Sequence, residues 1–207
     1  MRNQAQAMLV SKYMKHQEYD KAEALLAEIP DATAFNKRQL QANLYVAKND
    51  IDKAIKITEE RLLTETNNVL SALFTLNGIA LKNEAFDDAE YIADRARDFT
   101  KLFDLWDYSA YVAYLDVYTV KKDAKKCMDT LEKLLIAATK PWNYQDSPLY
   151  RHVAPAQKQE DIKNMILPRL LSEIEDPGMP EYDFLRNAPE YPEFIARLKS
   201  QLDTEMK

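Results

Sequence analysis

Glycine is scarce in this chain, since its 207 residues include only Gly78 and Gly178. Phosphate-cradling loops and tight hairpins depend on glycine, because positive φ angles cost little only for that residue. The sequence therefore argues against a nucleotide-binding loop and against a protein built mainly of sheets. Alanine, leucine, lysine and the acidic residues abound instead, and these suit helices and their ends. We expect an all-α protein.

Cysteine and histidine are nearly absent. Cys127 is the only cysteine, which excludes an internal disulfide and a cysteine-rich zinc site. His16 and His152 are the only histidines, and neither has partners at metal-ligand spacing. Cys127 and His152 could be imagined as nucleophile and base, but no orienting group or glycine-rich oxyanion loop accompanies them. We therefore expect no catalysis, no metal and no cofactor.

The chain also lacks long runs of basic residues and long runs of apolar residues. The formal net charge is −6 and no run of basic residues reaches four, so direct nucleic-acid contact by this chain is not expected. No apolar run is long enough to predict a membrane span, and the N-terminal residues lack the apolar core of a signal peptide. A bacterial, cytoplasmic setting fits these absences. Apolar residues make up 46% and charged residues 30%, which is typical of a globular chain.

A short pattern recurs along the chain, in which a bulky apolar residue precedes Asp-x-Ala. It occurs as Tyr19-Asp20-Lys21-Ala22, Ile51-Asp52-Lys53-Ala54 and Phe86-Asp87-Asp88-Ala89. The alanines lie 32 and 35 residues apart, and Ala124 follows another 35 residues on. This period predicts stacked helix pairs. We expect each Asp to cap the second helix of a pair, and each Ala to let the first helix approach closely.

The apolar periodicity predicts four such pairs. Their helices are expected at about 4–15 and 20–29, 35–48 and 52–63, 68–82 and 87–103, and 105–120 and 123–139. After Pro141 the pattern changes to an aromatic loop, an apolar helix over 162–174 that should bend or break at Pro168, and a last helix with Pro192 in its first turn.

These units resemble tetratricopeptide repeats, a family of antiparallel helix pairs stacked into a right-handed superhelix. The resemblance covers roughly residues 3–140, although the aromatic residue and the Gly usual in the first helix are missing from most units. It implies two parts: four tetratricopeptide-like repeats over 1–140, and a C-terminal helical extension over 141–207 that caps the stack.

The tail carries a second resemblance. Trp142 with Ser147-Pro148-Leu149-Tyr150, followed by Asp183-Phe184-Leu185-Arg186 and Pro189-Glu190-Tyr191, is similar to the C-terminal region of helix-turn-helix transcription regulators from Firmicutes. In those proteins a DNA-binding domain precedes a tetratricopeptide-like sensor. The resemblance implies a regulatory module that lacks its DNA-binding domain, binds a peptide or protein, and could form a homodimer. DNA would be reached only through the missing domain.

In a tetratricopeptide-like stack the first helix of each pair lines a concave groove. The groove positions expected here are Asn36, Gln39, Asn43, Ser71, Phe74, Lys82, Trp106 and Ser109. Amides and hydroxyls can pair with the backbone of an extended peptide, while Phe74 and Trp106 could hold apolar side chains. The alternative is that these polar residues simply solvate an exposed helix face.

The predicted helix over 105–120 carries a stripe of aromatic residues: Trp106, Tyr108, Tyr111, Tyr114 and Tyr118. This stripe could form the wall of a ligand site. We favour packing against the C-terminal helices, because tyrosine suits a core boundary where its hydroxyl reaches a partner. The leading interpretation is a peptide- or protein-binding regulatory module, and the alternative is a free-standing scaffold for protein assembly.

Overall fold

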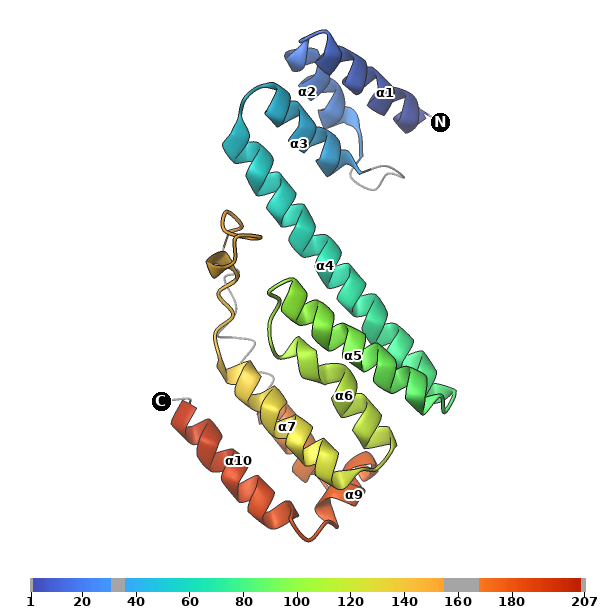
Figure 1. The fold of residues 1–207 in the computed structure, drawn as a ribbon, viewed down its shortest axis with the longest axis vertical. Helices are drawn as coiled ribbons and strands as arrows, with labels where there is room; N and C mark the ends of the chain where they lie inside the picture. The colour runs from blue at the N-terminus through green and yellow to red at the C-terminus, as the bar shows by residue number, and fades with distance from the viewer. Residues whose placement is uncertain (1, 31–35, 155–167, 206–207) are drawn as a thin grey trace. The chain divides into compact units, whose positions relative to one another are not determined.

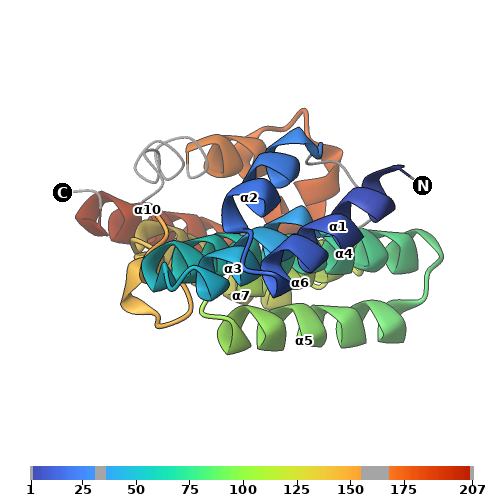
Figure 2. The same cartoon turned by 90° about the horizontal axis from the view of Figure 1, so that it is seen from above.

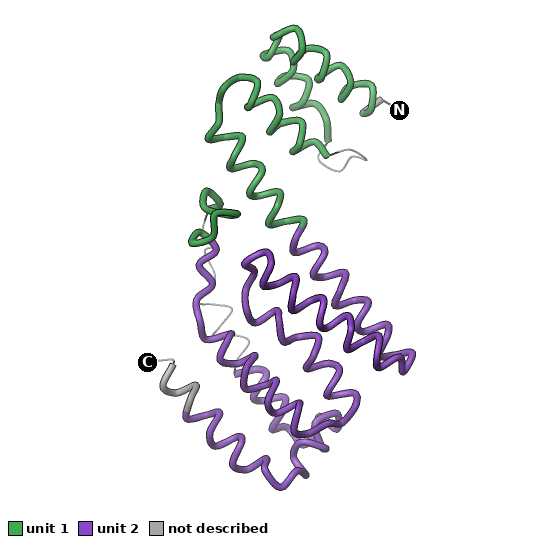
Figure 3. Tube along the Cα trace, in the orientation of Figure 1, with its two compact units in different colours: residues 1–65, 145–154 green, residues 66–144, 155–207 purple. Residues whose placement is uncertain are grey.

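The computed structural model describes residues 2–30, 36–154 and 168–205, and its regular elements in these ranges are all helical. Contacts group the chain into two compact units (Figure 3). Unit 1 holds residues 1–65 and 145–154, and unit 2 holds 66–144 and 155–207. The boundary expected between 140 and 141 falls inside unit 2.

Unit 1 is a small helical cluster. Its helices are α1 (Arg2–Lys15), α2 (Tyr19–Glu28), α3 (Lys37–Ala47) and the first part of α4 (Ile51–Lys82). Helices α1, α2 and α3 pack against one another in every pairing. Their shared core is made of Val10, Ala22, Leu26, Ile29 and Leu44, which recur at helical spacing and are buried.

Unit 2 contains the rest of α4 and a series of antiparallel helices. These are α5 (Phe86–Leu102), α6 (Ser109–Val120) and α7 (Ala124–Thr139), followed by α9 (Asp183–Arg186) and α10 (Tyr191–Glu205). Helix α5 runs back along the second part of α4, and α6 packs between α5 and α7 (Figures 1 and 2). Two short 3-10 helices, η1 (Tyr144–Asp146) and η2 (Pro180–Tyr182), lie in connecting segments.

The core of unit 2 joins α7 to the C-terminal elements. Leu131, Leu134 and Leu135 of α7 pack with Leu185 and Phe194, and all five are buried. Four aromatic residues of the predicted stripe pack against this cluster: Trp106, Tyr108, Tyr111 and Tyr118. These four residues thus pack against a cluster that contains both α7 and the C-terminal elements. The predicted helix over 162–174 is helical over its described part, 168–175, while the residues preceding Pro168 lie outside the described ranges.

The helix pairs are joined by turns that use the left-handed backbone conformation without glycine. The residues with positive φ are Gln17, Asn49, Glu84, Asp104 and Lys122. In each turn the next residue donates its N–H to a carbonyl five residues earlier, as from Glu18 to Tyr13 at 2.9 Å and from Asp123 to Tyr118 at 3.0 Å. This is the Schellman closure of a helix end. It explains how short interhelical turns form in a chain with so few glycines.

The turns correct the register of the fourth repeat. In the first three repeats the recurring alanines, Ala22, Ala54 and Ala89, lie five residues after the positive-φ residue and are buried. In the fourth repeat that position, which we call the anchor, is held by Cys127, which is also buried. Ala124, predicted as the fourth anchor, is instead the first residue of α7. Cysteine serves here because it is small and apolar.

The predicted caps are only partly correct. Asp20, Asp52 and Asp87 lie within the first turns of their helices rather than before them. A carboxylate there favours the helix through its dipole. Asp123 does act as an N-cap, since its side chain accepts a hydrogen bond from the Lys126 N–H at 3.1 Å.

The break predicted between the helices over 52–63 and 68–82 does not exist, because α4 is one helix of 32 residues. The connecting residues, Thr64-Glu65-Thr66-Asn67, include neither glycine nor proline, so nothing in them stops a helix. The Thr64 hydroxyl donates to the Glu60 carbonyl at 2.9 Å, so this polar side chain finds its hydrogen-bond partner within the same helix.

Candidate functional site

A pocket of about 390 Å³ opens on unit 2 between α5, α6 and α7. Its lining residues are Glu90, Asp94 and Arg97 from α5, Tyr111, Tyr114 and Tyr118 from α6, and Thr130 and Lys133 from α7. The residues from each helix are three, four or seven positions apart, so each set projects from one face of its helix. We call this site the tyrosine pocket. Its volume is typical of small binding sites.

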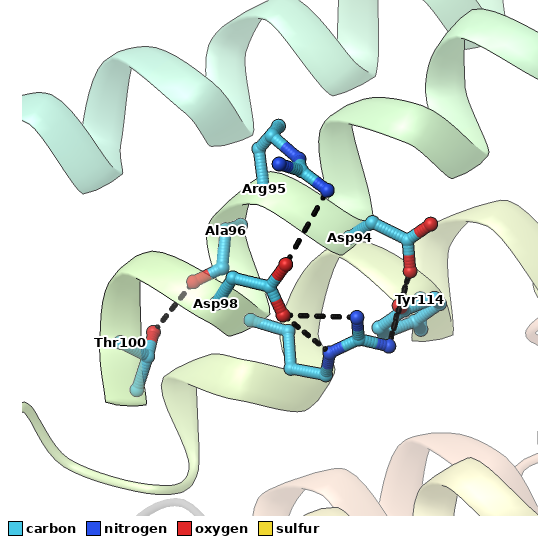
Figure 4. Close-up of polar contacts among 7 residues, drawn as sticks. Asp94, Arg95, Ala96, Asp98, Thr100 and Tyr114 are labelled. Atoms are coloured by element: carbon cyan, nitrogen blue, oxygen red, sulfur yellow. Dashed lines mark hydrogen bonds and ion pairs between the residues drawn. The ribbon is translucent and has the colours of Figure 1, made fainter. Parts of the chain in front are cut away.

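A hydrogen-bonded chain links α5 to α6 inside the pocket. The Arg97 Nη1 donates to the Tyr114 hydroxyl at 2.7 Å and lies 3.0 Å from the Asp94 carboxylate. The Tyr114 hydroxyl in turn donates to Asp94, and Figure 4 shows these two side chains turned toward each other. Burial and the hydrogen bond to Asp94 raise the pKa of the Tyr114 phenol well above its ordinary range. The phenol therefore stays protonated and keeps donating.

The remaining donors of Arg97 face Asp98. Arg97 Nε and Nη2 lie 3.0 Å and 2.9 Å from the same carboxylate oxygen, Asp98 Oδ1. The other Asp98 oxygen pairs with Arg95 at 3.3 Å (Figure 4). These contacts raise the pKa of Arg97 and lower the pKa of Asp98, chiefly through their mutual hydrogen bonds. Each of the three guanidinium nitrogens of Arg97 thus has a partner within the protein.

Aromatic rings connect the three helices. The Arg97 guanidinium lies 5.7 Å from the Tyr114 ring centroid, and Tyr114 stacks on Tyr118 with centroids 6.0 Å apart. Lys126 of α7 lies 5.2 Å from the Tyr118 ring. The two stacked rings thus have a cation at each end, and cations are attracted to the negative faces of aromatic rings. This arrangement fixes the tyrosines that wall the pocket.

The second carboxylate of the pocket, Glu90, is also paired. Lys121 at the end of α6 lies 2.6 Å from it, and this hydrogen bond raises the pKa of Lys121. Both acids of the pocket therefore have cationic partners from this chain: Lys121 for Glu90, and Arg97 for Asp94.

Four polar groups in the pocket remain available. Thr130 is only 7% exposed, while Lys133 is exposed. Within the described part of the chain, no hydrogen bond or ion pair engages the Lys133 ammonium or the hydroxyls of Tyr111, Tyr118 and Thr130. Burial raises the pKa of the Tyr118 phenol, so it too stays protonated. A ligand could meet these groups without breaking an existing bond.

The groove residues predicted in unit 1 bond chiefly to one another. Asn36 is the N-cap of α3 and accepts from the Gln39 N–H at 3.1 Å. The Gln39 amide donates to Asn43 at 2.9 Å and accepts from Arg61 of α4. The structure thus brings the three amides together, but Asn36 has a capping role and Gln39 is occupied by protein partners.

The groove residues predicted in unit 2 lie apart from the tyrosine pocket. Ser71 and Lys82 are exposed on α4, and Phe74 is half-buried there. Ser109 precedes Tyr111 by two residues, a separation that points side chains to different sides of a helix. Trp106 stacks on Tyr108 at 4.9 Å, and its buried Nε1 has no partner among the described residues.

Five residues of the pocket were not predicted from the sequence: Glu90, Asp94, Arg97, Thr130 and Lys133. The signal that could have revealed the first three is their spacing, which places three charged residues on one face of a helix beside a tyrosine-rich helix. The tyrosines themselves were considered as a ligand-site wall, and three of them, Tyr111, Tyr114 and Tyr118, line this pocket.

Cys127 and His152 each serve the packing of their own unit. Cys127 is buried, which raises the pKa of its thiol to about 11, and its sulfur lies 3.6 Å from the Thr119 hydroxyl. His152 in unit 1 bonds instead to Glu59, through its backbone N–H at 2.6 Å and its Nδ1 at 2.9 Å. Neither residue is set up as part of a nucleophile and base pair.

No family model matches this chain, and no curated protein or solved structure matches it either. None of the helices in the described ranges combines the length and apolar character needed to cross a bilayer. Nor does any group of three or more His, Cys, Asp or Glu side chains gather at metal-binding distance within those ranges.

Proposed function

We propose that this chain is a tetratricopeptide-like interaction module, in which the tyrosine pocket receives a side chain of a bound peptide or protein. The repeated turn supports the repeat architecture, because one positive-φ residue and one small anchor recur at the same five-residue separation in four turns. Helical repeats of this kind commonly build surfaces that bind other chains.

The observation that carries the binding function is that some polar groups of the pocket have no hydrogen-bond or ion-pair partner in the described ranges, while the others are paired within the protein. Tyr111, Tyr118, Thr130 and Lys133 offer donors, while Arg97 and the two carboxylates are held by protein partners. Burial raises the pKa of Tyr114 and of Tyr118, so these two phenols stay protonated near neutral pH, whereas a catalytic base must lose its proton there. This chemistry favours binding over catalysis.

Selection of peptides from a displayed random library by the full chain tests this function. We expect enriched peptides that bind with a dissociation constant on the order of micromolar. Thr130→Val, which removes a pocket hydroxyl at nearly constant volume, should weaken this binding. Asn43→Ala and Lys82→Gln, on the predicted groove face, are the matched controls and should leave binding unchanged.

Two results would count against the proposal. A library that yields no enriched peptide contradicts a peptide-binding function. Binding that is lost in Asn43→Ala or in Lys82→Gln, yet kept in Thr130→Val, would move the site from the tyrosine pocket to the helix that carries the substituted residue.

We also propose that the module is regulatory and serves a helix-turn-helix transcription regulator, on the resemblance of its tail. The motif residues of that tail have structural contacts: Leu185 is buried, and Arg186 donates to the carbonyls of Ile174 at 2.7 Å and Met179 at 2.6 Å. The regulatory role therefore rests on the resemblance alone. Mass spectrometry of the native N-terminus tests it, because helix-turn-helix residues ahead of Met1 are expected. A native start at Met1 favours the free-standing scaffold.

A further inference from the structure

The charges of the tyrosine pocket do not balance once the internal pairs are counted. Its lining holds two acids, Glu90 and Asp94, and two cations, Arg97 and Lys133. Glu90 is paired with Lys121 from outside the lining, at 2.6 Å, and Asp94 is paired with Arg97 at 3.0 Å. Asp98, outside the lining, also contacts Arg97 and has a second cationic partner in Arg95. Lys133 therefore remains as the charge that has no partner in the described part of the chain.

The groups around Lys133 act as donors toward a ligand. The ammonium has three N–H groups and no acceptor, and hydroxyls turn to donate when an anion is present. The hydroxyls of Thr130, Tyr111 and Tyr118 line the same pocket and have no partner within the described ranges. An oxyanion would therefore meet a cation and up to three hydroxyl donors.

Of the two acidic residues of α7 near Lys133 in sequence, Glu132 has another partner and Asp129 lines another pocket. Glu132 pairs with Arg197 of α10 at 2.9 Å. Asp129 lines a separate pocket between α7 and α10, together with Lys125 and Arg197. Lys126, stacked over Tyr118, adds positive charge to the pocket wall. This side of the pocket thus has two nearby cations, Lys133 and Lys126, although the chain as a whole is acidic.

We propose that the tyrosine pocket selects a carboxylate carried on a short apolar stem, with Lys133 pairing the charge and Thr130 donating a hydrogen bond to it. The rings of Tyr111 and Tyr118 pack against the stem. This inference rests on the proposed function, since it names the chemistry of the group that the pocket receives. The carboxylate belongs either to an acidic side chain of a peptide or to a free organic acid.

The preference for a carboxylate can be tested by titrating the full chain with small ligands and following it by heteronuclear NMR. Binding is measured from the chemical shifts of the backbone amides of residues 90–97, 111–118 and 130–133. The probes are hydrocinnamate and its neutral amide, and the tripeptides acetyl-Leu-Glu-Leu-amide and acetyl-Leu-Gln-Leu-amide. We expect each acid to bind its site about fivefold or more tightly than the matched amide, because one ion pair and its hydrogen bonds separate them. The advantage should shrink as salt rises from about 50 to about 500 mM.

Variants connect this selection to named residues. Lys133→Met should remove most of the difference between acid and amide, while Thr130→Val should reduce it. Lys101→Met changes an exposed lysine of α5 outside the pocket and should leave the difference intact. Tighter binding by the tripeptide than by hydrocinnamate identifies a peptide as the source of the carboxylate, and the reverse order identifies a free acid.

Three outcomes would overturn the inference: equal affinity for acid and amide, a preference that survives Lys133→Met, or shifts that saturate elsewhere on the chain. If acids and amides bind the pocket equally, the charge selection is wrong and the binding function stands. If no probe binds while library peptides do, the carboxylate inference fails alone. If neither probes nor library peptides bind, both proposals fail.

Discussion

The carboxylate of Glu59 holds His152 at two points, 93 positions apart in sequence but within unit 1. Glu59 is only 8% exposed, so these bonds satisfy a buried acid. We expect Glu59→Ala to lower the free energy of unfolding by about 2 kcal/mol, because hydrogen bonds to charged groups are worth roughly 1.5–3 kcal/mol. Urea denaturation measures this loss, and hydrogen exchange should show the His152 amide losing protection.

Two further variants separate the contributions of the two hydrogen bonds between Glu59 and His152. His152→Ala keeps the backbone N–H and loses only the ring contact, so it should cost about half as much as Glu59→Ala. Glu60→Ala, which changes the neighbouring carboxylate, is the control and should alter stability little. Equal effects of Glu59→Ala and Glu60→Ala would show that the contact with His152 is not the cause.

A substitution in the turn before α7 should raise the free energy of unfolding. Lys122 has a φ of 54°, a left-handed conformation that is costly for a residue with a Cβ. Lys122→Gly should therefore stabilise the protein by about 1 kcal/mol, as judged by the midpoint of chemical denaturation. Lys125→Gly, three residues on and inside α7, should destabilise it by a similar amount. A destabilised Lys122→Gly would contradict the assigned turn.

Leucine substitutions test the corrected register of the fourth repeat. Ala89 and Cys127 occupy fully buried anchor positions, whereas Ala124 is half-buried at the start of α7. Ala89→Leu and Cys127→Leu should each overpack a helix contact and cost about 2 kcal/mol or more. Ala124→Leu should cost much less, because the first three repeats carry a bulky residue there. Melting temperatures of the three variants distinguish this register from one anchored at Ala124.

The helices could be predicted from sequence because their apolar spacing is local, but details set by other parts of the fold could not. Ala22, Ala54 and Ala89 are buried as expected. The anchor role of Cys127 emerged only from the turn at Lys122, since that repeat is three residues longer than the pattern suggested. The continuity of α4 was not predicted, because a period of 32 to 35 residues implies a turn between successive helix pairs. Residues 64–67 nevertheless contain no glycine or proline that would end the helix.

The site was harder to predict for a physical reason. Amides such as Gln39 look available in a sequence, but their hydrogen bonds depend on tertiary neighbours, here Asn43 and Arg61. The tyrosine pocket likewise needs three helices in contact before Arg97 can reach Tyr114. Periodicity places residues on a face of a helix, but it does not show which faces leave a hollow between them.

The hydroxyl of Tyr114 offers a direct test of the chain that links α5 to α6. Tyr114→Phe keeps the ring that stacks on Tyr118 and removes the group that bridges Arg97 and Asp94. We expect a loss of about 1 kcal/mol in unfolding free energy, because the ion pair between Arg97 and Asp94 remains. Tyr111→Phe is the matched control, since its hydroxyl has no partner in the described ranges. Equal losses in both variants would contradict a specific role for the Tyr114 hydroxyl.

Burial of Cys127 predicts how stability changes at alkaline pH. Its thiol has a pKa of about 11 in the folded protein, above its ordinary value of 9.0, because burial disfavours the thiolate. Above about pH 9 the unfolded chain therefore loses this proton first, so ionisation favours unfolding until the folded thiol also titrates. The unfolding free energy of the wild type should fall by up to about 2 kcal/mol more than that of Cys127→Ala between about pH 9 and about pH 11. Denaturation curves of both proteins, measured under reducing conditions, give this difference directly, and parallel curves would show that the thiol does not contribute.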